Sequence, residues 1–412
     1  MISRGYEGIP LNSYRRIDRG FLHYLTVFAM IVAPLTSLRF WYIGVAEIFF
    51  IALMLRNFVA TWKKSYLKRM VISRFWLPYL FFILVGFLYK NLIGIETSSS
   101  ESIIFDLLAY IVVMIACVNV EFLVVSGRLN AFLLMRHVFY FASILFSILF
   151  VISTFTPTLF GFPLLYYDYF SPLVLNLHHF SMFMSPLIFI GYFIFKGERG
   201  VGMLLAGALV VVDVVMVFNS GSFKAVAGFF VGVFICCVLP IYDSIKTNNN
   251  LKVIFWVGMF TFFYFFLLVG GWEVFRVIFD EADSGGGRTA LYYDGFLLAL
   301  KSFPFGLGPG SHLWSNYEWS DTHQTLLTCF LQAGIFGVVL ISVLYFRIWK
   351  RLFYSPELLA AFSTILIYSA GGDIMRRLPT WIFLILLLHF KLEIGRRKKD
   401  HSAGIGARLR VV

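Results

Sequence analysis

Residues 325–346 read TLLTCFLQAGIFGVVLISVLYF, a run without one charged side chain. A helix needs about 20 apolar residues to cross the hydrocarbon core of a bilayer. This run therefore predicts a membrane-spanning helix. By the same criterion we expect about twelve spans, at 21–38, 40–57, 75–93, 103–124, 138–159, 178–195, 201–218, 222–240, 253–270, 325–346, 357–373 and 378–391.

The composition excludes a soluble protein. Hydrophobic residues make up 60% of the 412 residues and charged residues 14%, whereas soluble domains have about 45–50% and about 25%. A soluble fold cannot bury this much apolar surface. We therefore expect an all-α integral membrane protein, with residues 1–412 forming a single polytopic domain.

The net charge of +12, from 34 Lys and Arg against 22 Asp and Glu, indicates topology rather than a nucleic-acid surface. Cytoplasmic loops of membrane proteins carry the excess of Lys and Arg. With the N-terminus inside, all but eight basic residues fall on the inner side, so both termini and the basic tail 392–412 are predicted to be cytoplasmic. The eight at the outer side or rim are Arg39, Lys90, Lys224, Arg276, Arg288, Lys301, Arg376 and Arg377.

The longest segment between spans is residues 271–324, on the predicted outer side. Long loops in compact proteins are usually functional or disordered, and the many aromatic residues of this one argue against disorder. We expect a short helix in the outer interface that begins at Arg288, and then a tight, backbone-exposed turn at Pro304–Gly310. The apolar face expected for the helix consists of Ala290, Tyr293, Leu297 and Leu300.

Ionisable groups at the outer rim of a membrane are costly and are candidates for function. The topology places seven of them on one face: Lys224, Arg288, Asp321, His323, Asp373, Arg376 and Arg377. Grouped cations suit a diphosphate or another anionic lipid headgroup, and a histidine suits proton transfer. Asp321 could orient His323, and Asp373 could support the site. The plainer alternative is that Arg376, Arg377 and Lys224 bind no ligand. Their side chains would then only extend from helix ends to the membrane surface.

The long loop resembles the O-antigen ligase/polymerase superfamily. The matching pieces are Arg288-Thr-Ala-Leu-Tyr, then Pro304-Phe-Gly-Leu-Gly-Pro-Gly310, then Asp321-Thr-His-Gln-Thr followed by Gln332-Ala-Gly-Ile-Phe-Gly337. An earlier stretch, Asn219-Ser-Gly-Ser-Phe-Lys-Ala, resembles the family's Ser-Arg-Gly segment. The chain departs from the family pattern in having Lys224 in place of Arg and Gln324 in place of Asn.

The resemblance implies a membrane glycosyltransferase of the lipid-linked-donor (GT-C) type in the bacterial inner membrane, inverting, metal-independent and without a cofactor. Its donor would be an undecaprenyl-diphosphate-linked glycan at the periplasmic face. Arg288 and Lys224 would bind the diphosphate, with Arg376 and Arg377 as further candidates, and His323 would activate the acceptor hydroxyl.

Three functions remain open at this point. The first is a polysaccharide polymerase that moves a glycan onto a lipid-linked repeat unit, for which a chain-length regulator is a possible partner. The second is an O-antigen ligase that uses the lipid A core as acceptor. The third is a flippase for lipid-linked oligosaccharides. A flippase is disfavoured because mid-span charge is sparse (Glu47, Asp106 and Asp213) and no internal repeat is evident.

Overall fold

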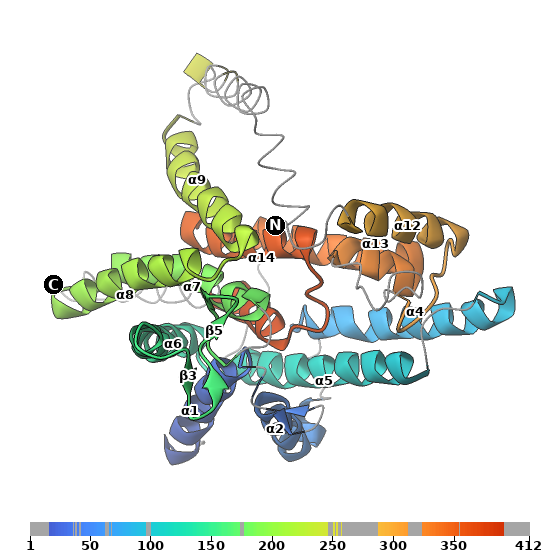
Figure 1. Ribbon diagram of the computed structural model, residues 1–412, viewed down its shortest axis with the longest axis horizontal. Coiled ribbons are helices and arrows are strands. Elements are labelled where there is room, and N and C mark those ends of the chain that lie inside the picture. Colours follow the sequence, from blue (N-terminus) through green and yellow to red (C-terminus); the bar gives the residue numbers. More distant parts are fainter. Residues whose placement is uncertain are drawn as a thin grey trace, which may run out of the picture.

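The structure is a computed structural model, and Figure 1 shows a chain made almost entirely of helices. It describes residues 16–35, 37, 39–40, 43–61, 66, 68–95, 100–173, 177–245, 250–251, 253, 257, 287–311, 324–353 and 355–390. The helices are α1 (Arg16–Val32), α2 (Val45–Thr61), α4 (Ser73–Ile93), α5 (Ser100–Val125), α6 (Ala131–Ser153), α7 (Leu177–Gly197), α8 (Val201–Phe218), α9 (Phe223–Ile245), α12 (Gly287–Lys301), α13 (Thr325–Leu352), α14 (Pro356–Gly371) and a final helix, Leu378–Phe390.

Seven helices in the described part of the chain, α4 to α9 and α13, are long and apolar enough to cross a membrane. Their outward-facing side chains are often large and apolar, such as Leu92, which is 84% exposed, and Leu204, which is 68% exposed. Contiguous exposed apolar surface of this kind is unfavourable in water and suits lipid. The chain is therefore a helical, membrane-embedded protein.

Each predicted span that falls within the described residues coincides with a helix, and all of span 253–270 except residues 253 and 257 lies outside them. The main difference in boundaries is that α6 starts at Ala131 and not near 138. The side chain of Asn130 accepts a hydrogen bond from Leu133 N at 2.8 Å, which is a helix N-cap that the apolar pattern alone did not reveal.

Strands occur in the described residues only as short antiparallel hairpins between helices. The first hairpin, β1 (Arg39–Phe40) with β2 (Ile43–Gly44), joins α1 to α2. Two more follow α6: β3 (Thr158–Leu159) with β4 (Phe162–Pro163), and β5 (Leu165–Tyr166) with β6 (Tyr169–Phe170). The connection from α6 to α7 therefore contains two hairpins in its described part.

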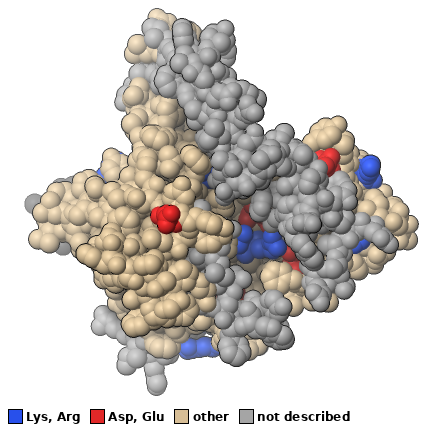
Figure 2. All heavy atoms as spheres, in the orientation of Figure 1, with Lys and Arg blue, Asp and Glu red and all other residues tan. Residues whose placement is uncertain are grey.

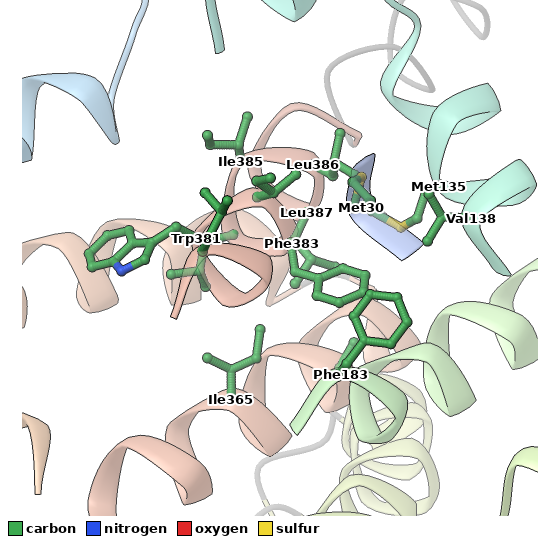
Figure 3. Packing of buried hydrophobic residues seen from close by; sticks show 14 of the residues in the cluster. Met30, Met135, Val138, Phe183, Ile365, Trp381, Phe383, Ile385, Leu386 and Leu387 are labelled. Atoms are coloured by element: carbon green, nitrogen blue, oxygen red, sulfur yellow. The ribbon is translucent and has the colours of Figure 1, made fainter. Parts of the chain in front are cut away.

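The final helix, Leu378–Phe390, forms the centre of the core. Apart from Pro379, all its residues are buried, and a helix that is apolar all round belongs in an interior. Figure 3 shows its side chains surrounded by residues of four other helices. These neighbours include Met30 from α1, Met135 and Val138 from α6, Phe183 from α7 and Ile365 from α14.

Ion pairs show how the helices around this core are oriented. Arg136 at the start of α6 lies 2.8 Å from Glu198, just beyond the end of α7. Lys196 near the end of α7 lies 2.5 Å from Glu357 at the start of α14. The start of α6, the end of α7 and the start of α14 therefore meet at one end of the molecule, so α7 runs opposite to α6 and α14.

Candidate functional site

The candidate site begins with a break in α13. Gly334 has φ 62° and ψ −154°, which divides the helix in two. The sequence predicted a membrane-spanning helix over 325–346, and α13 is long and apolar enough to be one, but the break within it was not predicted. A break leaves backbone groups without their helical partners, and in a membrane these groups need partners from the protein. The break therefore requires another segment of chain to lie against it.

That segment is the glycine-rich turn, Pro304–Gly310. It runs beside the break and forms three backbone hydrogen bonds with it. These bonds run from Leu307 N to Leu331 O (2.6 Å), from Gly308 N to Gln332 O (3.0 Å) and from Ile335 N to Pro304 O (3.0 Å). The turn and the two halves of α13 therefore form one unit.

The glycines of the turn are needed because the backbones touch. A Cβ on Gly308 would lie 2.6 Å from Cα of Phe87 in α4, and a Cβ on Gly306 would lie 2.5 Å from Gly334 N. Residues 306–311 are all buried. The expectation of a backbone-exposed turn was therefore wrong: the glycines allow close packing between α4 and α13.

A buried carboxylate joins this unit to the predicted basic cluster. Asp106 of α5 accepts a hydrogen bond from Gly310 N at 2.8 Å, and its other oxygen lies 3.1 Å from Nη1 of Arg376. The sequence showed Asp106 only as a sparse mid-span charge. Its partners are more than 200 residues away along the chain, and no local spacing reveals such contacts.

Residues 371–377 connect α14 to the central helix and carry Asp373, Arg376 and Arg377. Nε of Arg376 lies 3.5 Å from Oδ2 of Asp373, and Asp373 also accepts a hydrogen bond from Met375 N at 2.9 Å. Trp381 of the central helix donates to the carbonyls of Ile374 and Met375, both at 3.1 Å. This connection, the basic turn, is thus anchored on the core.

The start of α13 lies against the basic turn. The hydroxyl of Thr325 donates to Gly372 O at 2.8 Å and accepts from Ile374 N at 3.1 Å. Gln324 caps the helix, since its side chain accepts from Leu327 N at 2.5 Å. His323 and Asp321 lie outside the described residues, but the chain two residues after His323 contacts the basic turn.

Lys224 approaches the basic turn from α9. It is 2% exposed, and a Cβ on Gly371 would lie 2.8 Å from Cε of Lys224. Behind it, Tyr368 of α14 donates to Ser181 of α7 at 2.6 Å, and its hydroxyl lies 3.0 Å from that of Ser222. The structure therefore brings Lys224, Asp373, Arg376 and Arg377 around one turn.

A cavity opens beside the basic turn, between α2 and α7. Its polar lining consists of Glu47, His179, Arg376, Arg377 and Thr380. Figure 2 shows basic and acidic side chains together in a hollow near the centre of the view, at the place where Figure 1 draws the connection after α14. Glu47 and His179 were not among the predicted site residues. A glutamate inside an apolar span was the only signal that could have indicated the first of them.

Helix α12 carries Arg288 near its start, as predicted, and packs on α13 (Figure 1). The side chain of Arg288 is outside the described residues. Ala299 is buried against Leu327 and Leu331, whereas Tyr293, Leu297 and Leu300 of the predicted apolar face are exposed. The expected face therefore points outward, and a smaller face contacts the protein.

The arrangement holds cationic side chains of the protein in fixed positions around the basic turn, which lies next to a polar cavity. Among the described residues, no group of three His, Cys, Asp or Glu side chains is placed to hold a metal ion. Comparison of the sequence with protein-family models and with curated proteins finds no match.

Proposed function

We propose that the chain is a bacterial surface-polysaccharide polymerase. In this proposal it transfers an O-antigen or exopolysaccharide glycan from undecaprenyl diphosphate to a lipid-linked repeat unit, at the periplasmic face of the inner membrane. Both termini are cytoplasmic, and the fold is of the lipid-linked-donor glycosyltransferase type. The observation that supports it best is the gathering of Lys224, Arg376 and Arg377 around a turn that contacts Thr325, two residues after His323.

The proposed reaction is a single displacement. The acceptor hydroxyl oxygen bonds to the anomeric carbon of the donor, while the bond from that carbon to the diphosphate oxygen breaks, so the configuration inverts. His323, oriented by Asp321, takes the hydroxyl proton. Arg288 and Lys224 neutralise the departing undecaprenyl diphosphate, and stabilisation of that charge contributes much of the rate.

His323→Ala and Arg288→Ala variants test this assignment. Each is expected to reduce transfer by at least about 100-fold, because loss of a positioned acid–base group or a charge-stabilising group typically costs this much. The measurement is glycan transfer by purified protein that has inserted normally in the membrane. Arg136→Ala is the matched control, since Arg136 lies near the start of α6 in a partly exposed pair with Glu198, at the opposite end of α7 from His179. Full transfer by either site variant would refute the site.

A further inference from the structure

Asp106 is a charged side chain in a place where an apolar one would ordinarily pack. It lies in α5 and is 0% exposed. Ionisable groups inside membrane helices are costly, and they persist where they have partners or a function. Partners from three different segments of the candidate site lie around this carboxylate.

The two oxygens of Asp106 divide these partners between them. Oδ2 accepts hydrogen bonds from Gly310 N at 2.8 Å and from Nε2 of Gln332 at 3.3 Å. Oδ1 lies 3.1 Å from Nη1 of Arg376. Gln332 is itself held by Tyr79 of α4, whose hydroxyl donates to Oε1 at 3.1 Å. One carboxylate thus contacts the end of the glycine-rich turn, the first half of α13 and the basic turn.

The orientation of Arg376 follows from these contacts. Its guanidinium lies between two carboxylates, with Nη1 near Asp106 and Nε at 3.5 Å from Asp373. A guanidinium has five N–H donors in a rigid plane. Contacts at two of its nitrogens therefore determine where the remaining donors point. Arg376 is 17% exposed and lines the cavity with Arg377 and His179. Arg376 is therefore held in a fixed orientation at the lining of the cavity.

We propose that Asp106 is a positioning residue: it holds the glycine-rich turn against the break in α13 and at the same time fixes Arg376 toward the cavity. It does not contact the substrate. Only the activity measurement that tests this inference rests on the proposed function. The position of the turn is measurable without any substrate.

The first test measures the position of the turn. Ser311 is buried and its hydroxyl donates to Gly308 O at 2.7 Å, so a cysteine introduced by Ser311→Cys should react slowly with a water-soluble maleimide. We expect that adding Asp106→Asn to the Ser311→Cys protein speeds labelling at least tenfold. The unsubstituted protein measures the labelling of the native cysteines, which is subtracted. Asp213→Asn is the matched control, because Asp213 is an equally buried span carboxylate that accepts a hydrogen bond from Ser143 of α6. The control should leave labelling unchanged.

The second test measures coupling to Arg376. We expect Asp106→Asn and Arg376→Gln each to lower kcat of glycan transfer at least tenfold, and the double variant to lose little more than either single variant. Coupled residues give such non-additive effects. A double variant whose loss is the product of the two single losses would overturn the inference.

Two further outcomes keep the proposal and the proposed function distinguishable. If Asp106→Asn does not fold, Gln332→Met removes the amide that donates to Asp106 and accepts from Tyr79, and several-fold faster labelling at position 311 is expected. Unchanged labelling with either variant would overturn the positioning role. If the unsubstituted protein transfers no glycan, the proposed function is wrong, while the labelling experiment still decides whether Asp106 holds the turn.

Discussion

At the scale of single residues, the buried carboxylates serve distinct purposes, and their partners show which. Glu121 of α5 accepts hydrogen bonds from Val71 N at 2.6 Å and from the amide and hydroxyl of Ser73 at 2.8 and 2.7 Å. It also lies 3.0 Å from Nε2 of His389 in the central helix. Glu121 thus caps the start of α4 and ties it to the core, which is a structural role.

We expect Glu121→Ala to destabilise the protein by about 3 kcal/mol, because it leaves several buried donors without an acceptor. The measurement is the thermal unfolding transition in detergent. Glu198→Ala serves as the control, since a partly exposed ion pair contributes about 0–1 kcal/mol. Equal transitions for the two variants would show that the cap contributes little.

Candidate residues could be found in the sequence where a charged residue interrupts an apolar pattern. The partners of these residues could not be predicted from it. Lys224, Arg376 and Arg377 stood out as cations at the outer rim, and the structure gathers them around one turn. Asp106 and Glu47 were visible as charges but had no assigned purpose. The contacts that give Asp106 its position join α5 to residues at 310, 332 and 376. Such contacts arise from packing.

At the scale of elements, apolar periodicity was enough to find the helices, and it failed where a helix is broken. Gly334 sits in an uncharged run and resembles any other glycine there. Its conformation is set by the glycine-rich turn, since a Cβ on Gly334 would lie 1.9 Å from the carbonyl oxygen of Pro304. The side of α12 that packs on the protein, at Ala299, was not predicted for a related reason: the partner helix, α13, selects the side that packs.

We therefore expect Gly334→Ala to disrupt the unit formed by α13 and the turn. The added Cβ collides with backbone and requires φ 62° with ψ −154°, a region that is essentially restricted to glycine and costs about 1–3 kcal/mol for other residues even without a collision. Thermal unfolding and glycan transfer should both fall. Gly20→Ala in α1 is the control, because its Cβ meets no atom within 4 Å. A Gly334→Ala protein as stable and active as this control would contradict the packing described.

At the scale of the whole molecule, composition and the long apolar helices define a helical membrane protein, and the structure adds how these helices pack around a central one. The central helix is buried on nearly every side and begins directly after the basic turn. The proposed catalytic end is consequently fixed to the most buried element in the described part of the chain. The order of spans could be predicted from hydropathy, but a 13-residue helix at the centre, roughly 20 Å long, could not be distinguished from an ordinary span.

The central claim is that this end of the molecule polymerises lipid-linked glycans. Its most direct test offers purified protein undecaprenyl-diphosphate-linked repeat units, alone and together with lipid A core, and analyses the length of the products. We expect long glycans on undecaprenyl diphosphate in the absence of core. Transfer that occurs only when lipid A core is present would identify a ligase, and no transfer under either condition would contradict the assignment as a glycosyltransferase.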